Sequence, residues 1–523
     1  MAGLLVVGIH STMSNRSLVV KGAAWIALAR LFVILIGLAS TLILARLLTP
    51  EDFGLVAIAG AVAAVIGSIT ELSLAQALIQ HDDPQDYHYD TAWTLNNIRA
   101  ILLSVLIGTS APFIASAYGD PRLLSILLFM AAMTLIDGLQ SPRLVGFQRN
   151  LVFWQEFVLS VSEKIAGIVV GVIVAIIFQN YWALIFGSAA TRIFRIIASY
   201  FLAPYHPRVG LQGHRELLSF SVWLTFSKTI QMINWRADPL ILGAAIQPVI
   251  LGQYSMSDNL AGMPIREGLG PIRQTLFPAF SRIKNDMGRL NAAYLRVQGL
   301  LCLLALPIGA GFAAVAQPAV HLLLGEAWLP AVPMIQALAL IMAFEACEGY
   351  QPLAMALGRT RAMFGRELRA VSIRLPLLIA GAVAGWQVGG EFSTVMGAIG
   401  GRGMAALINV TWNMILIRKM TGITLGCQVF VIMRPLAASA AMFALLAYVL
   451  SPYLLQDLDA PILLTLVLMI LAGIVTYVTM IFLAWLLSGM PSSSEMEIIK
   501  FFDRLGVFFR KNLQKDKRAG DGT

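Results

Sequence analysis

The chain is built from long apolar stretches separated by short polar connections, and this pattern runs through its 523 residues. A helix needs about 20 apolar residues to cross the hydrocarbon core of a bilayer. By this measure the sequence predicts about fourteen transmembrane helices, so the expected fold is an all-α polytopic membrane protein. The predicted helices are centred near residues 34, 66, 105, 131, 165, 192, 232, 265, 306, 343, 377, 405, 439 and 473.

Three of these stretches have interrupted apolar patterns. The eighth contains Pro264, Pro271 and Pro278, and because proline removes a helix hydrogen bond, we expect that helix to be broken. The eleventh and twelfth stretches are rich in glycine, which favours close packing of membrane helices. Their glycines are Gly385, Gly389, Gly390, Gly397, Gly400, Gly401 and Gly403.

An internal repeat links the two halves of the chain, because residues 21–54 return in register at 219–252. Six helices per half give both repeats the same orientation, so we expect them to be related by an axis along the membrane normal. At an offset of 198, the matched residues are Trp25 and Trp223, Arg30 and Lys228, Pro50 and Pro248, Gly54 and Gly252, and Gln76 and Gln274. Later matches pair 118–121 with 324–327 and 137–140 with 348–351.

The repeat and the connections divide the chain into six predicted segments. These are an N-terminal cytoplasmic segment at 1–17, an N-lobe of helices one to six at 18–203, an inter-lobe loop at 204–213, a C-lobe of helices seven to twelve at 214–419, helices thirteen and fourteen at 420–489, and a basic cytoplasmic tail at 490–523.

Positive charge is concentrated on one side of this predicted topology. Connections on the side of the termini carry thirteen Lys or Arg residues, whereas the opposite connections carry Arg122 alone. Cytoplasmic loops of membrane proteins are enriched in Lys and Arg, so both termini are expected in the cytoplasm. Only 12% of the residues are charged, which excludes an ordinary soluble protein. The net charge of +9 follows from the topology and the basic tail, and nucleic acid is not an expected partner.

Cations recur inside the apolar helices, where each costs roughly 2.5–3.5 kcal/mol on insertion scales. Arg30 and Lys228 occupy matched positions of the repeat, and Arg236 and Arg273 lie within the seventh and eighth helices. Such residues persist where they face water, a partner or a ligand. These four are the predicted substrate-binding residues of a cationic cavity, and interhelical ion pairs are the alternative.

Carboxylates also lie within the predicted helices. Asp238, Asp258, Glu71 and Asp137 are candidates for binding a coupling Na⁺ or H⁺ or for forming structural ion pairs, and Glu163, Glu345 and Glu348 are similarly embedded. Arg236 and Asp238 do not share a helix face, and Pro239 predicts a discontinuous seventh helix there. The three cysteines lack the spacing of a metal site or a disulfide framework. No cofactor is expected beyond a coupling ion.

Two short stretches resemble a known family. Residues 44–54 read Leu-Ala-Arg-Leu-Leu-Thr-Pro-Glu-Asp-Phe-Gly, and residues 270–282 contain Gly-Pro-Ile followed by Leu-Phe-Pro-Ala-Phe-Ser-Arg. The first resembles the link between helices one and two of polysaccharide transporters, and the second resembles the end of their eighth helix. These transporters are the Wzx-like flippases of the multidrug/oligosaccharidyl-lipid/polysaccharide superfamily.

This resemblance implies two six-helix bundles in a V shape around a central cavity. In that family, cavity cations hold the diphosphate and acidic sugars of a polyprenyl-linked oligosaccharide during alternating access. Related lipid II flippases carry arginines on the first helix, where this chain has Arg30. Lys228 departs from their arginine at the repeat-equivalent position, so an exopolysaccharide, capsule or O-antigen precursor is expected rather than a peptidoglycan precursor.

The expected protein is therefore a flippase of the bacterial cytoplasmic (inner) membrane. Its expected partners are a polyprenyl-diphosphate-linked oligosaccharide, membrane lipids, and a polysaccharide polymerase with its chain-length machinery. A Na⁺- or H⁺-coupled drug antiporter of the same fold stays open, although the repeat-matched charges are basic. A membrane polymerase or glycosyltransferase also stays open, although it would need a large catalytic segment. The dipeptide Gly-Lys is absent, which excludes a P-loop ATPase.

Overall fold

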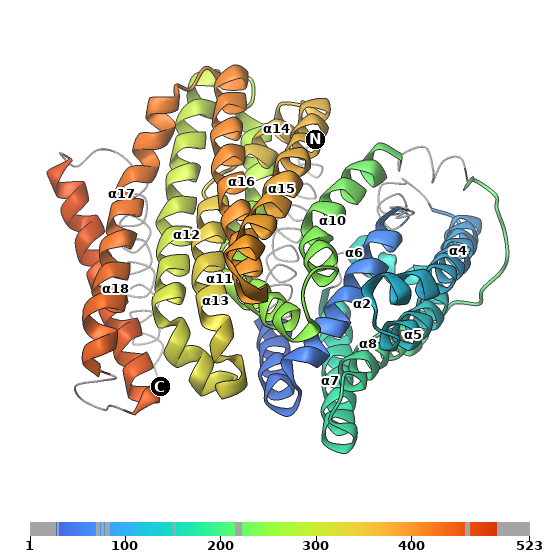
Figure 1. The fold of residues 1–523 in the computed structure, drawn as a ribbon. Helices are drawn as coiled ribbons and strands as arrows, with labels where there is room; N and C mark the ends of the chain where they lie inside the picture. Colours follow the sequence, from blue (N-terminus) through green and yellow to red (C-terminus); the bar gives the residue numbers. More distant parts are fainter. Residues whose placement is uncertain are drawn as a thin grey trace, which may run out of the picture. The chain divides into compact units, whose positions relative to one another are not determined.

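The structure is a computed structural model that describes residues 28, 31–69, 74, 78, 84–149, 153–214, 222–454 and 461–488. In this part of the chain the regular structure is helical, without strands (Figure 1). Each of the fourteen predicted centres falls inside a helix, the first of them within Leu31–Leu47. Nine of the described helices are long and apolar enough to cross a membrane. The predicted all-α membrane protein is confirmed.

Contacts divide the described chain into two compact units. The first unit runs to Ser255 and includes Leu323–Trp328 and Gly390–Phe392, and the second contains the remainder. The first unit is built from α2 (Pro50–Ile69), α4 (Asp86–Tyr118), α5 (Arg122–Asp137), η1 (Pro142–Leu144), α6 (Val145–Arg149), α7 (Phe153–Phe178), α8 (Trp182–Leu202), α10 (Val222–Gly243) and the first turns of α11 (Pro248–Ile283).

The second unit begins within α11 and continues to the last described helix. Its elements are the rest of α11, α12 (Met287–Leu323), the end of η2 (Glu326–Ala331), α13 (Val332–Glu345), α14 (Tyr350–Ala356), α15 (Thr360–Val388), most of α16 (Gly390–Thr421), α17 (Leu425–Leu445), the π-helical turn η3 (Leu446–Leu450) and α18 (Ile462–Leu487). In the first unit α10 packs against α2, whereas the repeat assigns α10 to the C-lobe. The lobe boundaries therefore stay a prediction, and segments 1–17 and 490–523 lie outside the described residues.

Proline does not interrupt the seventh and eighth helices, so the predicted breaks were wrong. α11 continues through Pro264, Pro271 and Pro278, and α10 continues through Pro239. Each proline removes one backbone donor, while the other hydrogen bonds of the helix remain. Ending a helix inside a membrane would leave several backbone groups without partners, so the continuous helix has the lower free energy.

The fourth and tenth helices are instead split at matched positions of the repeat. α5 ends at Asp137 and is followed by η1 and α6. α13 ends at Glu345, and α14 begins at Tyr350, just after Glu348. The segments 137–140 and 348–351, which match in sequence, therefore both lie at a helix break.

Glycines bring the backbones of neighbouring helices together in both units. In the second unit, a Cβ on Gly397 of α16 would overlap the carbonyl oxygen of Gly381 of α15. In the first unit, Gly167 of α7 and Gly187 of α8 face each other's carbonyl oxygens in the same way. The close packing predicted for the glycine-rich helices is confirmed for Gly385, Gly397 and Gly401, whereas Gly389, Gly390 and Gly400 have no atom within 4 Å of a Cβ position.

The two repeats begin their second helix with different caps. At the start of α2, the backbone N–H and the hydroxyl of Thr49 both donate to Asp52, at 2.9 and 2.7 Å. This arrangement satisfies a helix-terminal donor locally, as in a capping box, with Pro50 at the first helical position. At the start of α11 an isoleucine occupies the position of Asp52, and the N–H of Gln247 donates to Glu391 at 2.9 Å. The second repeat therefore obtains its cap from a distant helix.

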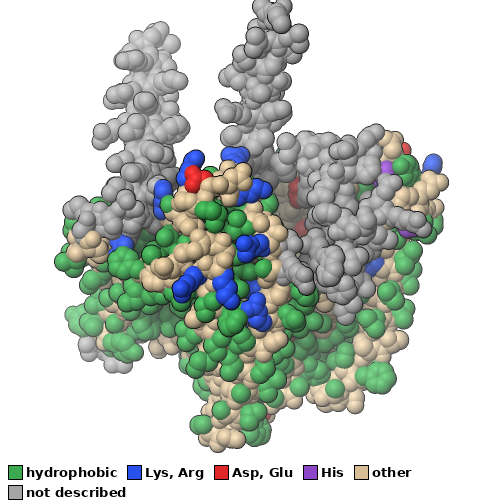
Figure 2. Space-filling view, turned by 90° about the horizontal axis from the view of Figure 1, so that it is seen from above, with side chains coloured by type: hydrophobic (Ala, Val, Ile, Leu, Met, Phe, Trp, Pro, Cys, Tyr) green, Lys and Arg blue, Asp and Glu red, His purple; other side chains and the backbone are tan. Residues whose placement is uncertain are grey.

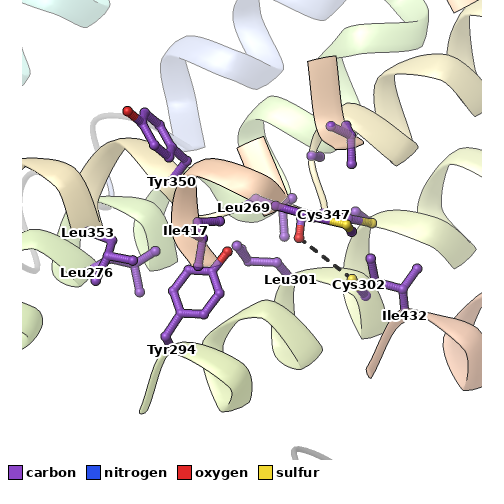
Figure 3. Close-up of a cluster of buried hydrophobic side chains, with 14 of the residues drawn as sticks. Leu269, Leu276, Tyr294, Leu301, Cys302, Cys347, Tyr350, Leu353, Ile417 and Ile432 are labelled. Carbon is purple, nitrogen blue, oxygen red and sulfur yellow. Dashed lines mark hydrogen bonds between the residues drawn. The ribbon is translucent and has the colours of Figure 1, made fainter. Parts of the chain in front are cut away.

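A buried apolar cluster forms the core of the second unit and supports its helix break (Figure 3). It combines side chains of α11, α12, α14, α16 and α17. Figure 3 shows Tyr294 and Cys302 of α12 in the same cluster as Cys347, in the turn before α14, and Tyr350 within α14. The thiol of Cys302 donates to the carbonyl oxygen of Cys347 across 3.8 Å. The turn that splits the tenth helix is therefore packed against α12.

Candidate functional site

Polar side chains converge on the helix break of the second unit. The carboxylate of Glu348 accepts hydrogen bonds from Arg366 of α15 at 2.8 Å and from the amide of Asn413 of α16 at 2.5 Å. Arg366 also donates to the amide oxygen of Asn413 at 3.2 Å. A second carboxylate, that of Glu367, binds the same guanidinium at 2.8 Å. Two acids therefore share one arginine at a site enclosed by apolar helices.

Two further arginines lie beside this break. Arg273 of α11, a predicted substrate-binding residue, donates to the backbone carbonyl of Ala346 at 3.0 Å. Arg369 of α15 donates to the carbonyl of Gly365 at 3.1 Å, and its guanidinium lies 5.0 Å from the ring centroid of Trp412. Among the described residues, neither arginine forms an ion pair with a carboxylate. Their charges are therefore not neutralised by direct contact.

The matching break in the first unit carries ion pairs with a different arrangement. Asp137, at the end of α5, accepts a hydrogen bond from Arg192 of α8 at 2.5 Å. Glu163 of α7 accepts from Arg195 of α8 at 3.0 Å. Each acid here has an arginine of its own. The structure thus places Asp137, a candidate for ion coupling or a structural pair, in an ion pair.

Arg236 and Asp238 have different surroundings, as their spacing predicts. Asp238 is buried and accepts a hydrogen bond from the hydroxyl of Tyr254 at 2.6 Å. Arg236, two residues earlier on α10, is exposed. Residues two apart point to different sides of a helix, so one can be held in the interior while the other faces outward.

α11 and α16 are joined by an ion pair that the sequence identified only in part. Asp258 of α11, a predicted ion-coupling or structural residue, accepts a hydrogen bond from Arg402 of α16 at 2.6 Å. Arg402 is buried, and we did not single it out from the sequence. The available signal was a cation within a glycine-rich apolar stretch, the same signal that identified Arg30.

α11 also exposes a cation that the sequence analysis missed. Arg266 donates to the backbone and side-chain oxygens of Asn259, at 3.2 and 3.3 Å. It lies seven residues before Arg273, and residues seven apart share a helix face. Both arginines are exposed on α11. The seven-residue spacing of Arg266 and Arg273 was the signal in the sequence that could have identified Arg266.

The predicted site residues are distributed over the two units. Arg236, Asp238 and Asp137 lie in the first unit, and Arg273 and Asp258 lie in the second. Lys228 belongs to α10, but its side chain lies outside the described residues, as do Arg30 and Glu71 entirely. The common cationic cavity therefore stays a prediction. Within the described ranges, no three His, Cys, Asp or Glu side chains are grouped so that they could hold a metal ion.

A second cluster that the sequence analysis missed lies between α4 and α5. Arg122 binds the carboxylates of Asp120 and Glu51, both at 2.7 Å. The hydrogen bond from this guanidinium holds the pKa of Asp120 below its usual value of 3.8. In the sequence, Arg122 stood out only as the single cation in the connections opposite the termini. The acid two residues before it was the available signal for an ion pair.

The predicted inter-lobe loop is fastened to the beginning of α4. The hydroxyl of Tyr205 donates to Asp90 at 2.5 Å, and the hydroxyl of Thr91 donates to the carbonyl of Gln212 at 2.6 Å. Burial, together with the neighbouring Asp90 carboxylate, raises the pKa of Tyr205 above its ordinary value. Residues 204–213 therefore form a fixed part of the first unit.

Known proteins resemble this chain over most of its length. A family of polysaccharide biosynthesis proteins matches residues 43–333. The lipopolysaccharide biosynthesis protein WzxC of Escherichia coli (strain K12) is 24% identical over 348 residues, covering 63% of this chain and 68% of WzxC. The succinoglycan biosynthesis transport protein ExoT of Rhizobium meliloti (strain 1021) is 26% identical over 391 residues, covering 73% of this chain and 77% of ExoT.

A solved structure shares the fold. The lipid II flippase MurJ, in an inward closed conformation, superposes with a TM-score of 0.63 at 13% identity, covering 88% of this chain and 98% of MurJ. At this identity the likeness shows the fold alone. The resemblance to polysaccharide transporters predicted from residues 44–54 and 270–282 is confirmed, because the family match covers more than half of the chain. The chain belongs to the family of polysaccharide biosynthesis proteins.

Proposed function

We propose that this protein moves undecaprenyl-diphosphate-linked oligosaccharide repeat units across the bacterial cytoplasmic membrane. The product would serve the synthesis of an exopolysaccharide, a capsule or an O-antigen. The observation that carries the proposal is the family match over residues 43–333. The relatives WzxC and ExoT are named for lipopolysaccharide biosynthesis and for succinoglycan biosynthesis transport.

Physical chemistry explains what such a protein has to supply. A diphosphate and an oligosaccharide lose their hydration when they enter hydrocarbon, which costs free energy, whereas a polyprenyl tail is apolar and dissolves in the lipid. Cations on membrane-spanning helices compensate the phosphate charge, and arginine matches phosphate with two parallel hydrogen bonds. Arg236 of α10 and Arg273 of α11 are exposed, and we assign them this role together with Arg30 and Lys228. Alternating access of the cavity would carry the headgroup across while the tail stays among membrane lipids.

We further propose that both termini lie in the cytoplasm and that the membrane is the inner one. The charge bias of the connections supports this orientation. Figure 2 shows Lys and Arg side chains gathered on one face, with few acidic side chains among them. On the outer side, a polysaccharide polymerase with its chain-length machinery would consume the product. This consumption, or a Na⁺ or H⁺ gradient, would supply the driving force.

The test is transfer of a fluorescent undecaprenyl-diphosphate oligosaccharide between the leaflets of proteoliposomes. Wild type is compared with Arg30→Ala and Lys228→Ala, and Lys419→Ala serves as the matched control because Lys419 is exposed at the end of α16. We expect wild type and Lys419→Ala to transfer the lipid at similar rates. We expect at least a tenfold loss in the two cavity variants, because removing a charged hydrogen bond costs about 1.5–3 kcal/mol.

Two results would overturn parts of this proposal. Absence of transfer by wild type with neutral and acidic glycans, combined with uptake of organic cations under an ion gradient, would make the protein a drug antiporter. Full transfer by both Arg30→Ala and Lys228→Ala would retain the flippase but remove these cations from its mechanism.

A further inference from the structure

We propose that the helix break of the second unit is a proton-binding site, in which Glu348 takes up the proton that drives transport. The coupling to transport rests on the proposed flippase function, whereas the proton binding does not. Nothing in the repeat or in the charge bias assigns this role. It follows from the arrangement of acids and arginines around Glu348.

Two acids contact one cation in this site. Glu348 and Glu367 bind different nitrogens of Arg366, both at 2.8 Å. The side chains of Glu348, Glu367 and Arg366 are only 17%, 12% and 22% exposed. A single guanidinium compensates one carboxylate, and a second ionised carboxylate in the same poorly solvated site is disfavoured. One proton shared by the acids removes this excess charge, as in other carboxylate pairs.

Other charged and titratable groups among the described residues surround Glu348 without binding its carboxylate. Arg273 lies on the α11 side, but its guanidinium is directed at the carbonyl of Ala346. Arg369 of α15 is directed at Gly365 and Trp412. The remaining neighbours are Glu345 at the end of α13, Tyr294 of α12 and Tyr350 of α14. In the direct contacts of the described residues, Glu348 and Glu367 thus outnumber the single arginine that binds them, while Glu345, Arg273 and Arg369 lie beside the network without binding either acid.

The matching break of the first unit has a different arrangement of acids and arginines. There Asp137 binds Arg192 and Glu163 binds Arg195, so each acid has a cation of its own. Arg99 of α4 adds a further positive charge near Asp137. The two breaks match in sequence but differ in the ratio of acids to arginines in their direct contacts. Among the described contacts, only the second unit's break has two acids on one arginine, which is why we place the proton there.

The geometry also indicates where the proton would sit and what its uptake would change. One carboxylate oxygen of Glu348 faces Arg366, and the other faces the Asn413 amide at 2.5 Å. The Asn413 amide donates its N–H to the second oxygen, so a proton there requires this amide to flip, which would also take the amide oxygen away from the Nε of Arg366. Neutral Glu348 would attract Arg366 less strongly. Because Glu348 sits in the turn between α13 and α14, protonation would loosen that turn from α15 and α16.

The first experiment measures proton binding without transport. Infrared pH titration of the purified full-length protein follows the C=O band of protonated carboxyl groups in wild type, Glu348→Gln, Glu367→Gln and Glu391→Gln. Glu391 is the matched control because it belongs to the first unit, where it accepts a hydrogen bond from Gln247 at the start of α11. We expect one titrating carboxyl to disappear in Glu348→Gln, to shift in Glu367→Gln and to persist in Glu391→Gln. An unchanged spectrum in Glu348→Gln would overturn the site.

The second experiment measures coupling in the proteoliposome assay, with and without an imposed pH gradient or Na⁺ gradient. We expect the pH gradient to accelerate lipid transfer by wild type and Glu391→Gln. We expect Glu348→Gln to lose that acceleration while keeping slow equilibration, and Glu348→Asp to restore it in part. Acceleration by Na⁺ alone, or an intact pH response in Glu348→Gln, would overturn the coupling.

Failure of this inference and failure of the proposed function give different results. If wild type does not flip lipid under any condition, the flippase proposal fails, while the infrared titration still decides whether Glu348 binds a proton. If Glu348→Gln does not fold, as judged by size-exclusion chromatography, Glu367→Gln tests the shared proton, because it removes the competing acid. A carboxyl titration unchanged by Glu367→Gln would then contradict the pair.

Discussion

Gly54 of α2 lies against the backbone carbonyl of Pro248, in the first turn of α11, so closely that a Cβ on Gly54 would overlap that oxygen. The contact is reciprocal, because a Cβ on Gly252 would overlap the carbonyl oxygen of Pro50. Residues that correspond in the sequence repeat thus meet each other within the first unit. Only glycine permits backbones to approach this closely, which explains why both repeats carry it four residues after the proline.

We predict that Gly54→Ala and Gly252→Ala each destabilise the protein. The added methyl group would push a backbone carbonyl, which cannot move aside as a flexible side chain can. Such overpacking costs about 1–3 kcal/mol. Thermal unfolding in detergent should show lower midpoints for both variants. The control is Gly60→Ala on the same helix, where no atom lies within 4 Å of a Cβ position. Equal midpoints for Gly54→Ala and Gly60→Ala would contradict the prediction.

The contact between Gly54 and Pro248 also illustrates what sequence reasoning could reach. The offset of 198 predicted that the two segments correspond, and in the structure a helix begins at the proline of each segment. That corresponding residues touch each other could not be predicted, because a repeat specifies similarity and not position. The cap at Asp52 is visible in the local sequence, because Asp52 is three residues from Thr49. The cap at Glu391 could not be predicted in this way, because Glu391 is 144 residues from Gln247.

The charged residues were predictable as a class but not as pairs. Asp137 and Glu348 were matched in sequence, and both lie at a helix break. Their arginines come from different helices of the two repeats, α8 for Asp137 and α15 for Glu348. The repeats diverged after duplication, so the partner in one unit does not identify the partner in the other. The length of the apolar stretches located the helices because a bilayer requires it, whereas ion pairs depend on the rotation and depth of each helix.

We predict that the ion pair of Asp120 and Arg122 stabilises the protein above the unfolded pKa of Asp120 and is lost in acid. The folded pKa lies below the usual value of 3.8 because Arg122 binds the charged carboxylate. The contribution is therefore complete near neutral pH and declines as the pH falls below 3.8 toward the folded pKa. Unfolding of wild type and Asp120→Asn should differ near neutral pH, and the difference should shrink in acid. A difference that does not depend on pH would contradict this assignment.

We predict that Gly397→Ala separates α15 from α16. The Cβ would overlap the carbonyl oxygen of Gly381, so both helices would have to move. The expected cost is again about 1–3 kcal/mol. Gly400→Ala, one turn along the same helix, is the control because nothing lies within 4 Å of its Cβ position. There the higher helix propensity of alanine should leave stability unchanged or raise it by up to about 1 kcal/mol. Similar losses in both variants would show that the effect is not one of helix packing.

The pair of Asp258 with the buried Arg402 should contribute more to stability than an exposed pair of the same chemistry. Their side chains are 37% and 7% exposed, and they lie 2.6 Å apart. Asp258→Asn would leave the buried guanidinium without this negative charge. Removing one partner of a buried pair costs about 3–5 kcal/mol, and we expect about 3 because Asp258 is partly exposed.

The matched comparison for that pair is Asp86→Asn, which removes the acid of the exposed pair with Arg143. Asp86 is 85% exposed and 2.8 Å from Arg143, and an exposed ion pair contributes roughly 0–1 kcal/mol. Thermal unfolding of both variants in the same detergent measures the difference directly. The double variant Asp258→Asn with Arg402→Gln should recover part of the loss, because it removes the buried charge together with its partner. A loss in Asp258→Asn no larger than that in Asp86→Asn would contradict the prediction, because it would show that burial of Arg402 does not increase the contribution of its ion pair.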